Sequence, residues 1–140
     1  MSNRLVIFFF LLSFCKADYG QLIFKFETEY QQTKKNRRSI PPSDTLHMYF
    51  DYDYKNDVVT IKTKGTTYTS DSLNAENVFG FGGKMAIPKK YLRNKVDLYF
   101  NNIKIASLRL DLKYSVTHLE YDKQGKKFTL RYIKYRAGYL

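Results

Sequence analysis

Histidine and carboxylate side chains are the residues of this chain best suited to acid–base chemistry, and few of them stand in suggestive positions. His47 and His118 are the two histidines, and neither is joined to a serine or an aspartate by a recognisable nucleophile motif. Glu120 and Asp122 share one face of an expected strand, whereas a glycosidase usually takes its two carboxylates from different elements. We therefore expect no catalytic residues and no enzyme. The alternative is a small secreted hydrolase that uses one histidine and a nearby carboxylate.

Metal and cofactor sites are equally scarce in the sequence. Asp51, Asp53 and Asp57 surround an expected turn with oxygen ligands that calcium accepts, but the glycine and the bidentate glutamate of an EF-hand are missing. The single cysteine excludes multi-cysteine zinc patterns. The glycine-rich stretch 80–83, which precedes Lys84, has neither spacing of the phosphate-binding fingerprints. A β-bulge or a close backbone approach is expected there instead, and the sequence predicts neither a metal nor a cofactor.

Basic residues dominate the charge of the chain, with 24 Lys and Arg against 13 Asp and Glu and a net charge of +11. Near the C-terminus they alternate with tyrosines, and we predict a polyanion-binding or glycan-binding strip there, formed by Arg131, Lys134, Tyr135 and Arg136. Nucleic acid is the usual partner of such an excess of basic residues, but the predicted export of the chain makes another polyanion the expected partner. An anionic envelope glycan or lipid, or another envelope protein, is the expected partner. The alternative is that the charge serves only solubility and protection of edge strands.

Residues 1–17 have the pattern of a secretory signal peptide. Arg4 precedes an apolar stretch, residues 5–14, that is too short to span a bilayer, and Ala17 supplies a small residue at the end. The pattern predicts a secreted or periplasmic protein without a transmembrane span. Cys15 closes the outline of a bacterial lipobox, although the bulky Phe14 stands where that motif has a small residue. Acylation of Cys15 would give a lipid-anchored envelope protein as the alternative.

Residues 18–140 are expected to form one domain built from strands. Apolar residues alternate with period two along most of it, turn residues separate the runs, and no helix-period stretch of ten or more residues follows the signal peptide. We predict an all-β fold, a single antiparallel β-sandwich of about eight or nine strands, with a small barrel as the alternative. The pattern also predicts a basic loop near residues 31–44, a hairpin that joins 46–54 to 58–63, and a bulge near residues 106–107. In the last strand Phe128, Leu130 and Tyr132 should face the core and Arg131 the solvent.

The region from Val58 to Leu140 has a Lys-Gly turn, a glycine-rich central strand, a Leu-Asp-Leu strand and a Lys-rich closing strand that ends in Tyr-Leu. This succession resembles small secreted immunoglobulin-like β-proteins of unknown function from flavobacteria-type bacteria. The resemblance implies an immunoglobulin-like fold and export, and it implies no chemistry. The tryptophan and paired cysteines of antibody domains are absent. Together the patterns predict an exported, non-catalytic binding or interaction module at the cell envelope.

Overall fold

The computed structural model describes residues 23–32, 38–75 and 80–136, so the predicted signal peptide 1–17 and Cys15 lie outside the described residues. Within these ranges the chain forms eleven strands and one short 3-10 turn. The expected all-β class is confirmed. No helix in the described ranges is long and apolar enough to cross a membrane.

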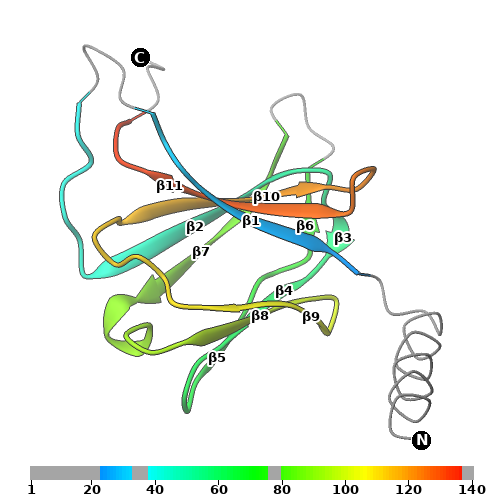
Figure 1. Ribbon diagram of the computed structural model, residues 1–140, viewed down its shortest axis with the longest axis horizontal. Helices are drawn as coiled ribbons and strands as arrows, with labels where there is room; N and C mark the ends of the chain where they lie inside the picture. The colour runs from blue at the N-terminus through cyan, green and yellow to red at the C-terminus, as the bar shows by residue number, and fades with distance from the viewer. Residues whose placement is uncertain (1–22, 33–37, 76–79, 137–140) are drawn as a thin grey trace, which may run out of the picture.

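The larger sheet has five strands and carries the candidate site. Its order is β1 (Lys25–Tyr30), β11 (Lys127–Ile133), β10 (Val116–Asp122), β2 (Thr45–Tyr52) and β7 (Phe81–Pro88) (Figure 1). β10 and β11 pair antiparallel as a hairpin. The expectation of purely antiparallel pairing is wrong at two places, because β1 runs parallel to β11 and β2 runs parallel to β10. Each of these pairs joins strands that are far apart in the sequence, so no tight turn imposes an antiparallel direction on it.

The second sheet has four strands, in the order β5 (Thr67–Thr69), β4 (Val59–Lys62), β8 (Val96–Phe100) and β9 (Ile103–Leu108). Two short strands, β3 (Lys55–Asp57) and β6 (Leu73–Asn74), pair with each other. The predicted hairpin from 46–54 to 58–63 is wrong, because β3 is extended and carries the chain from one sheet to the other. Short strands of this kind also raise the number above the expected eight or nine. None of the sheets formed by the described residues closes into a barrel.

One hydrophobic core lies between the two larger sheets. Leu46, Met48 and Phe50 on β2 are fully buried, as are Phe128 and Leu130 on β11, and Tyr132 is 1% exposed. The predicted inward face of the last strand is therefore confirmed. The alternate positions of the same strands point away from the core, which places their polar side chains together on the outer face of the five-stranded sheet.

Turns and bulges fix the register of the sheets. Asn101 and Asn102, both with positive φ, make the tight turn between β8 and β9, and Ile105 is the extra residue where the β8–β9 register shifts. The predicted bulge at 106–107 is thus present one residue earlier. Gly82 is bypassed where the β2–β7 register shifts, and a Cβ on Gly83 would come within 2.8 Å of Leu73 Cδ2. The bulge and close approach expected in the glycine-rich strand are confirmed.

Candidate functional site: a polar groove on the outer face of the five-stranded sheet

The outward positions of four neighbouring strands bring ionisable side chains side by side. His118 on β10 is registered with Tyr49 on β2 and with Arg131 on β11, and Arg131 is registered with Glu29 on β1. The surface above them is hollowed into an open groove of about 910 Å³. Its lining consists of Glu29, Tyr30, Gln31, Gln32, Ile40, Tyr49, Asp51, Tyr52, Val116, His118, Glu120, Arg131, Ile133 and Arg136.

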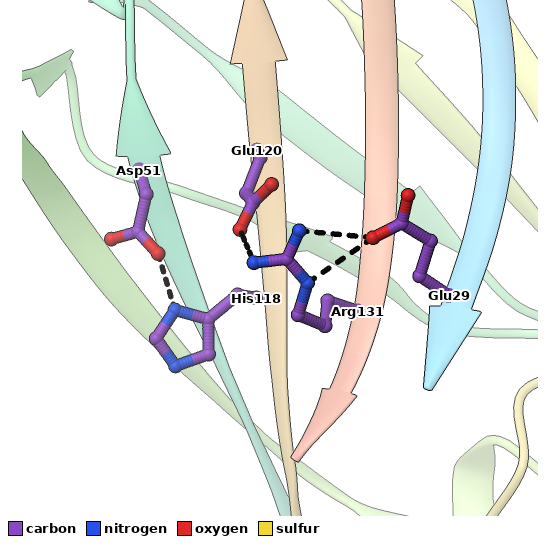
Figure 2. Close-up of polar contacts among 5 residues, drawn as sticks. All are labelled: Glu29, Asp51, His118, Glu120 and Arg131. Carbon is purple, nitrogen blue, oxygen red and sulfur yellow. Dashed lines mark hydrogen bonds and ion pairs between the residues drawn. The ribbon is translucent and has the colours of Figure 1, made fainter. Parts of the chain in front are cut away.

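An aspartate–histidine pair lies in this groove. His118 Nδ1 and Asp51 Oδ2 are in direct contact, across the parallel strands β10 and β2 (Figure 2). Because an ionised carboxylate only accepts hydrogen bonds, Nδ1 carries the hydrogen of this contact. Tyr49 stacks on the imidazole, with ring centroids 5.2 Å apart. Asp51 and Tyr49 thus fix the orientation of His118 and leave Nε2 as its other polar atom.

An arginine clamp lies next to this pair. Arg131 contacts Glu29 Oε2 through Nη2 at 2.9 Å and Glu120 Oε1 through Nη1 at 2.7 Å, so that one guanidinium joins β1, β11 and β10 (Figure 2). Although partial burial opposes it, the hydrogen bond to Glu29 and the charge of Glu120 raise the pKa of Arg131 above its ordinary value. Both carboxylates are therefore compensated by the same cation.

Glu120 is the least exposed carboxylate of the clamp, with a side chain that is 14% exposed. Burial raises its pKa above the ordinary value, Arg131 lowers it in part, and the charge of Asp51 adds to the rise. A carboxyl of this kind holds its proton at a higher pH than an exposed glutamate does.

Tyrosine rings border the groove. Tyr30 and Tyr52 are the more exposed, at 54% and 56%, and Tyr30 stacks on Tyr132 with ring centroids 5.0 Å apart. Tyr52 has a positive φ of 79° at the end of β2, and its backbone N–H donates to the carbonyl of Gly80 at 2.6 Å. A smaller hollow of about 390 Å³ adjoins the groove and shares Glu29, Tyr52, Glu120 and Arg131 with it.

The structure separates the residues of the predicted C-terminal strip. Arg131 and Arg136 both line the groove, but the charge of Arg131 is engaged by two glutamates. Lys134 and Tyr135 follow the end of β11, where the lysine ammonium lies 5.6 Å from the centre of the tyrosine ring and Tyr135 forms an isolated bridge with Ser39. Whether these residues bind a polyanion stays a prediction, as does lipidation of Cys15.

The other candidates from the sequence do not gather at one place. His47 lies on the groove side of β2 but does not line the groove. Asp53 accepts a hydrogen bond from the backbone of Lys123, and Asp57 accepts one from Asn101, so these two aspartates serve turns and not a shared ion with Asp51. No group of three or more metal-ligating side chains is found within the described ranges.

Sequence reasoning missed several residues of the groove. The sequence pattern gives no role to Glu29, Tyr49 or Tyr52, and it indicates Asp51 only as an oxygen ligand that calcium accepts. The available signal was strand alternation, which places Tyr49 with Asp51, and His118 with Glu120, on polar faces. Alternation cannot show that β2 lies beside β10, and this pairing is what brings Asp51 to His118.

The groove can do two kinds of chemistry. Its tyrosine faces and its fixed hydrogen-bonding groups can hold a polar ligand, and His118 Nε2 can exchange a proton with a bound hydroxyl or water. None of the described lining residues is a serine, threonine or cysteine, so a covalent nucleophile of these types is not supplied by that lining. Comparison of the chain with models of known protein families, with curated proteins and with solved structures found no match.

Proposed function

We propose that the protein is an exported, non-catalytic binding module of the cell envelope and that its ligand site is the groove on the five-stranded sheet. The observation that carries this proposal is the network of polar side chains that bind one another in the groove. Asp51 contacts His118, and Glu29 and Glu120 both pair with Arg131. The described lining residues carry three carboxylates and two arginines, so the groove has no large net charge. The signal-peptide pattern of residues 1–17 supports the location.

The ligand that fits best is an uncharged glycan. Sugars offer hydroxyl groups to fixed polar side chains and C–H faces to aromatic rings, and the groove supplies both through His118, Glu120 and Tyr52. A polyanion would need uncompensated cations, and of the two arginines that line the groove only Arg136 has no carboxylate partner in the described part of the chain. Binding of this kind should depend little on salt, because few counterions are released.

We further propose that the two larger sheets are the layers of a single β-sandwich. Their shared hydrophobic core supports this arrangement. The parallel pairing of β2 with β10 differs from the antiparallel sheets of an immunoglobulin domain. The resemblance to secreted immunoglobulin-like proteins therefore stays a prediction from sequence.

A panel of neutral and acidic glycans, tested by calorimetry with the purified protein, examines the binding proposal. We expect binding to a neutral glycan, and we expect Tyr52→Ala to weaken it about tenfold, which corresponds to the loss of one aromatic contact. Tyr91→Ala is the matched control, because Tyr91 is exposed and does not line the groove. Equal effects of the two variants, or salt-sensitive binding of acidic glycans alone, would contradict the proposal.

The Asp51–His118 pair favours a second candidate function, a hydrolase in which His118 acts as general base on a water molecule. An imidazole oriented by a carboxylate is the arrangement that such a step needs. A screen of ester and glycoside substrates tests it. Activity that is lost in His118→Gln and kept in His47→Gln would replace the binding module by this enzyme, and the absence of turnover would reject it.

A further inference from the structure

A basic knob projects from the connection between β7 and β8, away from the groove. We define it by Lys89, Lys90, Tyr91, Arg93 and Lys95. The 3-10 turn η1 (Lys89–Tyr91) begins directly after Pro88, which ends β7, and Val96 begins β8. In Figure 1 this connection is the yellow-green turn at the lower left.

The knob is anchored firmly enough to present its side chains in a fixed place. Leu92 is 1% exposed and belongs to the core. Its backbone N–H donates to the carbonyl of Lys89 at 2.9 Å, and the N–H of Lys89 donates to the carbonyl of Asp44 at 2.8 Å. A buried leucine and two backbone hydrogen bonds therefore hold a short turn in which Lys89 is half-buried and Lys90, Tyr91, Arg93 and Lys95 are exposed.

The charge of the knob is not compensated. Residues 84–95 contain five basic side chains and no acidic one. In the described part of the chain no carboxylate lies within ion-pair distance of Lys90, Arg93 or Lys95. Asp97, the carboxylate that follows the knob on β8, is bound by Ser107 and Lys104, which lower its pKa, and the charge of Lys95 acts on it more weakly. In the groove, by contrast, Arg131 is paired with two carboxylates.

An exposed aromatic ring stands among these cations. Tyr91 is 43% exposed, and the ammonium of Lys90 lies 4.9 Å from the centre of its ring. The ring of Tyr68 on β5 lies 6.3 Å away, which places the β4–β5 hairpin beside the knob. Lys64, exposed in the turn of that hairpin, adds a further cation on this side of the molecule.

We propose that the basic knob docks the protein onto an anionic lipid surface. Uncompensated Lys and Arg side chains are attracted to anionic headgroups, and tyrosine favours the interface between water and acyl chains, where its ring is apolar and its hydroxyl stays hydrated. None of the residues that define the knob lines the groove or the smaller hollow beside it. A projecting turn fits a flat surface, whereas a glycan chain is better held in a groove. The partner of the knob is therefore a lipid surface and not a glycan chain.

Vesicle sedimentation tests this inference with the full chain. The probes are vesicles of phosphatidylcholine with about one third phosphatidylglycerol, and vesicles of phosphatidylcholine alone. We expect the native protein to bind the anionic vesicles at low salt and to ignore the neutral ones. The variant Lys90→Gln/Arg93→Gln/Lys95→Gln should bind about a hundredfold more weakly, from about fivefold for each cation removed.

A matched variant removes three charges at the β10–β11 end, on the right in Figure 1. It is Lys25→Gln/Lys123→Gln/Lys126→Asn, with asparagine chosen because residue 126 has a φ of 49°. We expect its binding to stay within about threefold of native. Equal losses in the two variants, or no binding by the native protein, would overturn the inference. The inference would also be overturned if the knob variant lost the native protein's retention on heparin but still bound the anionic vesicles as tightly as the native protein does. Far-UV circular dichroism shows whether each variant is folded.

Discussion

Thr117 on β10 is a side chain whose hydroxyl is fully buried and has no hydrogen-bond partner among the described residues. A buried donor without a partner loses its bonds to water and gains nothing in return. We expect Thr117→Val, which keeps the shape and removes the hydroxyl, to raise the free energy of unfolding by about 1 kcal/mol. Urea denaturation measures it. Thr129→Val is the control on the neighbouring strand, and a loss of stability in Thr117→Val would show that the hydroxyl has a partner in solution.

Glu120 makes the stability depend on pH. Burial raises its pKa above the ordinary value of 4.5, with Arg131 opposing and Asp51 adding to the rise. The folded protein therefore holds this proton more tightly than the unfolded chain. The stabilisation is complete below the ordinary pKa and is lost as the pH rises through the folded value. We expect the native protein to lose stability relative to Glu120→Gln as the pH rises above about 4.5, measured by urea unfolding of both proteins. A gain over this range would mean that the pair with Arg131 outweighs burial.

Strand β1 is attached to the five-stranded sheet by ion pairs and by an aromatic ring. Two ion pairs, Glu27 to Lys127 and Glu29 to Arg131, link β1 to β11, and just before β1 the ring of Phe24 packs against Phe100 and Phe128 at 5.5 and 5.1 Å. Exposed ion pairs contribute less than about 1 kcal/mol, whereas the loss of a packed aromatic ring costs about 2–3 kcal/mol or more. We therefore expect the core contact to dominate.

Phe24→Ala should consequently expose the amides of β1 to hydrogen exchange and lower the urea midpoint, while Glu29→Gln should change both only slightly. The two variants act on the same strand and serve as controls for each other. A larger effect of Glu29→Gln would show that the arginine clamp, and not the aromatic ring, holds β1 in place.

The sequence pattern predicts which face of a strand is buried, and it does not predict which distant strands pair with each other. Alternation correctly placed Phe128, Leu130 and Tyr132 inside and Arg131 outside, because these faces depend only on neighbours along the chain. The turn at Asn101 and Asn102 was predictable for the same reason. The parallel pairing of β2 with β10 was not, since it depends on how the whole core packs. The Asp51–His118 contact results from that pairing, so the candidate site was only partly predictable.

The molecule carries two surfaces that differ in how their charges are paired. The groove pairs its charges, and the basic knob leaves its cations unpaired. If the proposals for both hold, a protein docked through the knob still presents the groove, because none of the residues that define the knob lines the groove. Ligand binding in the groove and lipid binding at the knob should then be independent, and calorimetry with and without anionic vesicles measures this directly.

Phe100 contacts both larger sheets, and we expect it to couple their unfolding. It lies on β8, yet its ring is 4.8 Å from that of Tyr121 and 5.0 Å from that of Phe128, both on the opposite sheet. We expect Phe100→Ala to lower the free energy of unfolding by about 3–4 kcal/mol and to keep a single transition, because neither sheet can bury its inner face alone. Tyr99→Ala, its neighbour on the outer face of β8, should cost about 1 kcal/mol or less. Far-UV and near-UV circular dichroism, followed together in urea, measure both quantities. Separate transitions by the two signals would contradict a shared core, because one sheet would then persist after the other had unfolded.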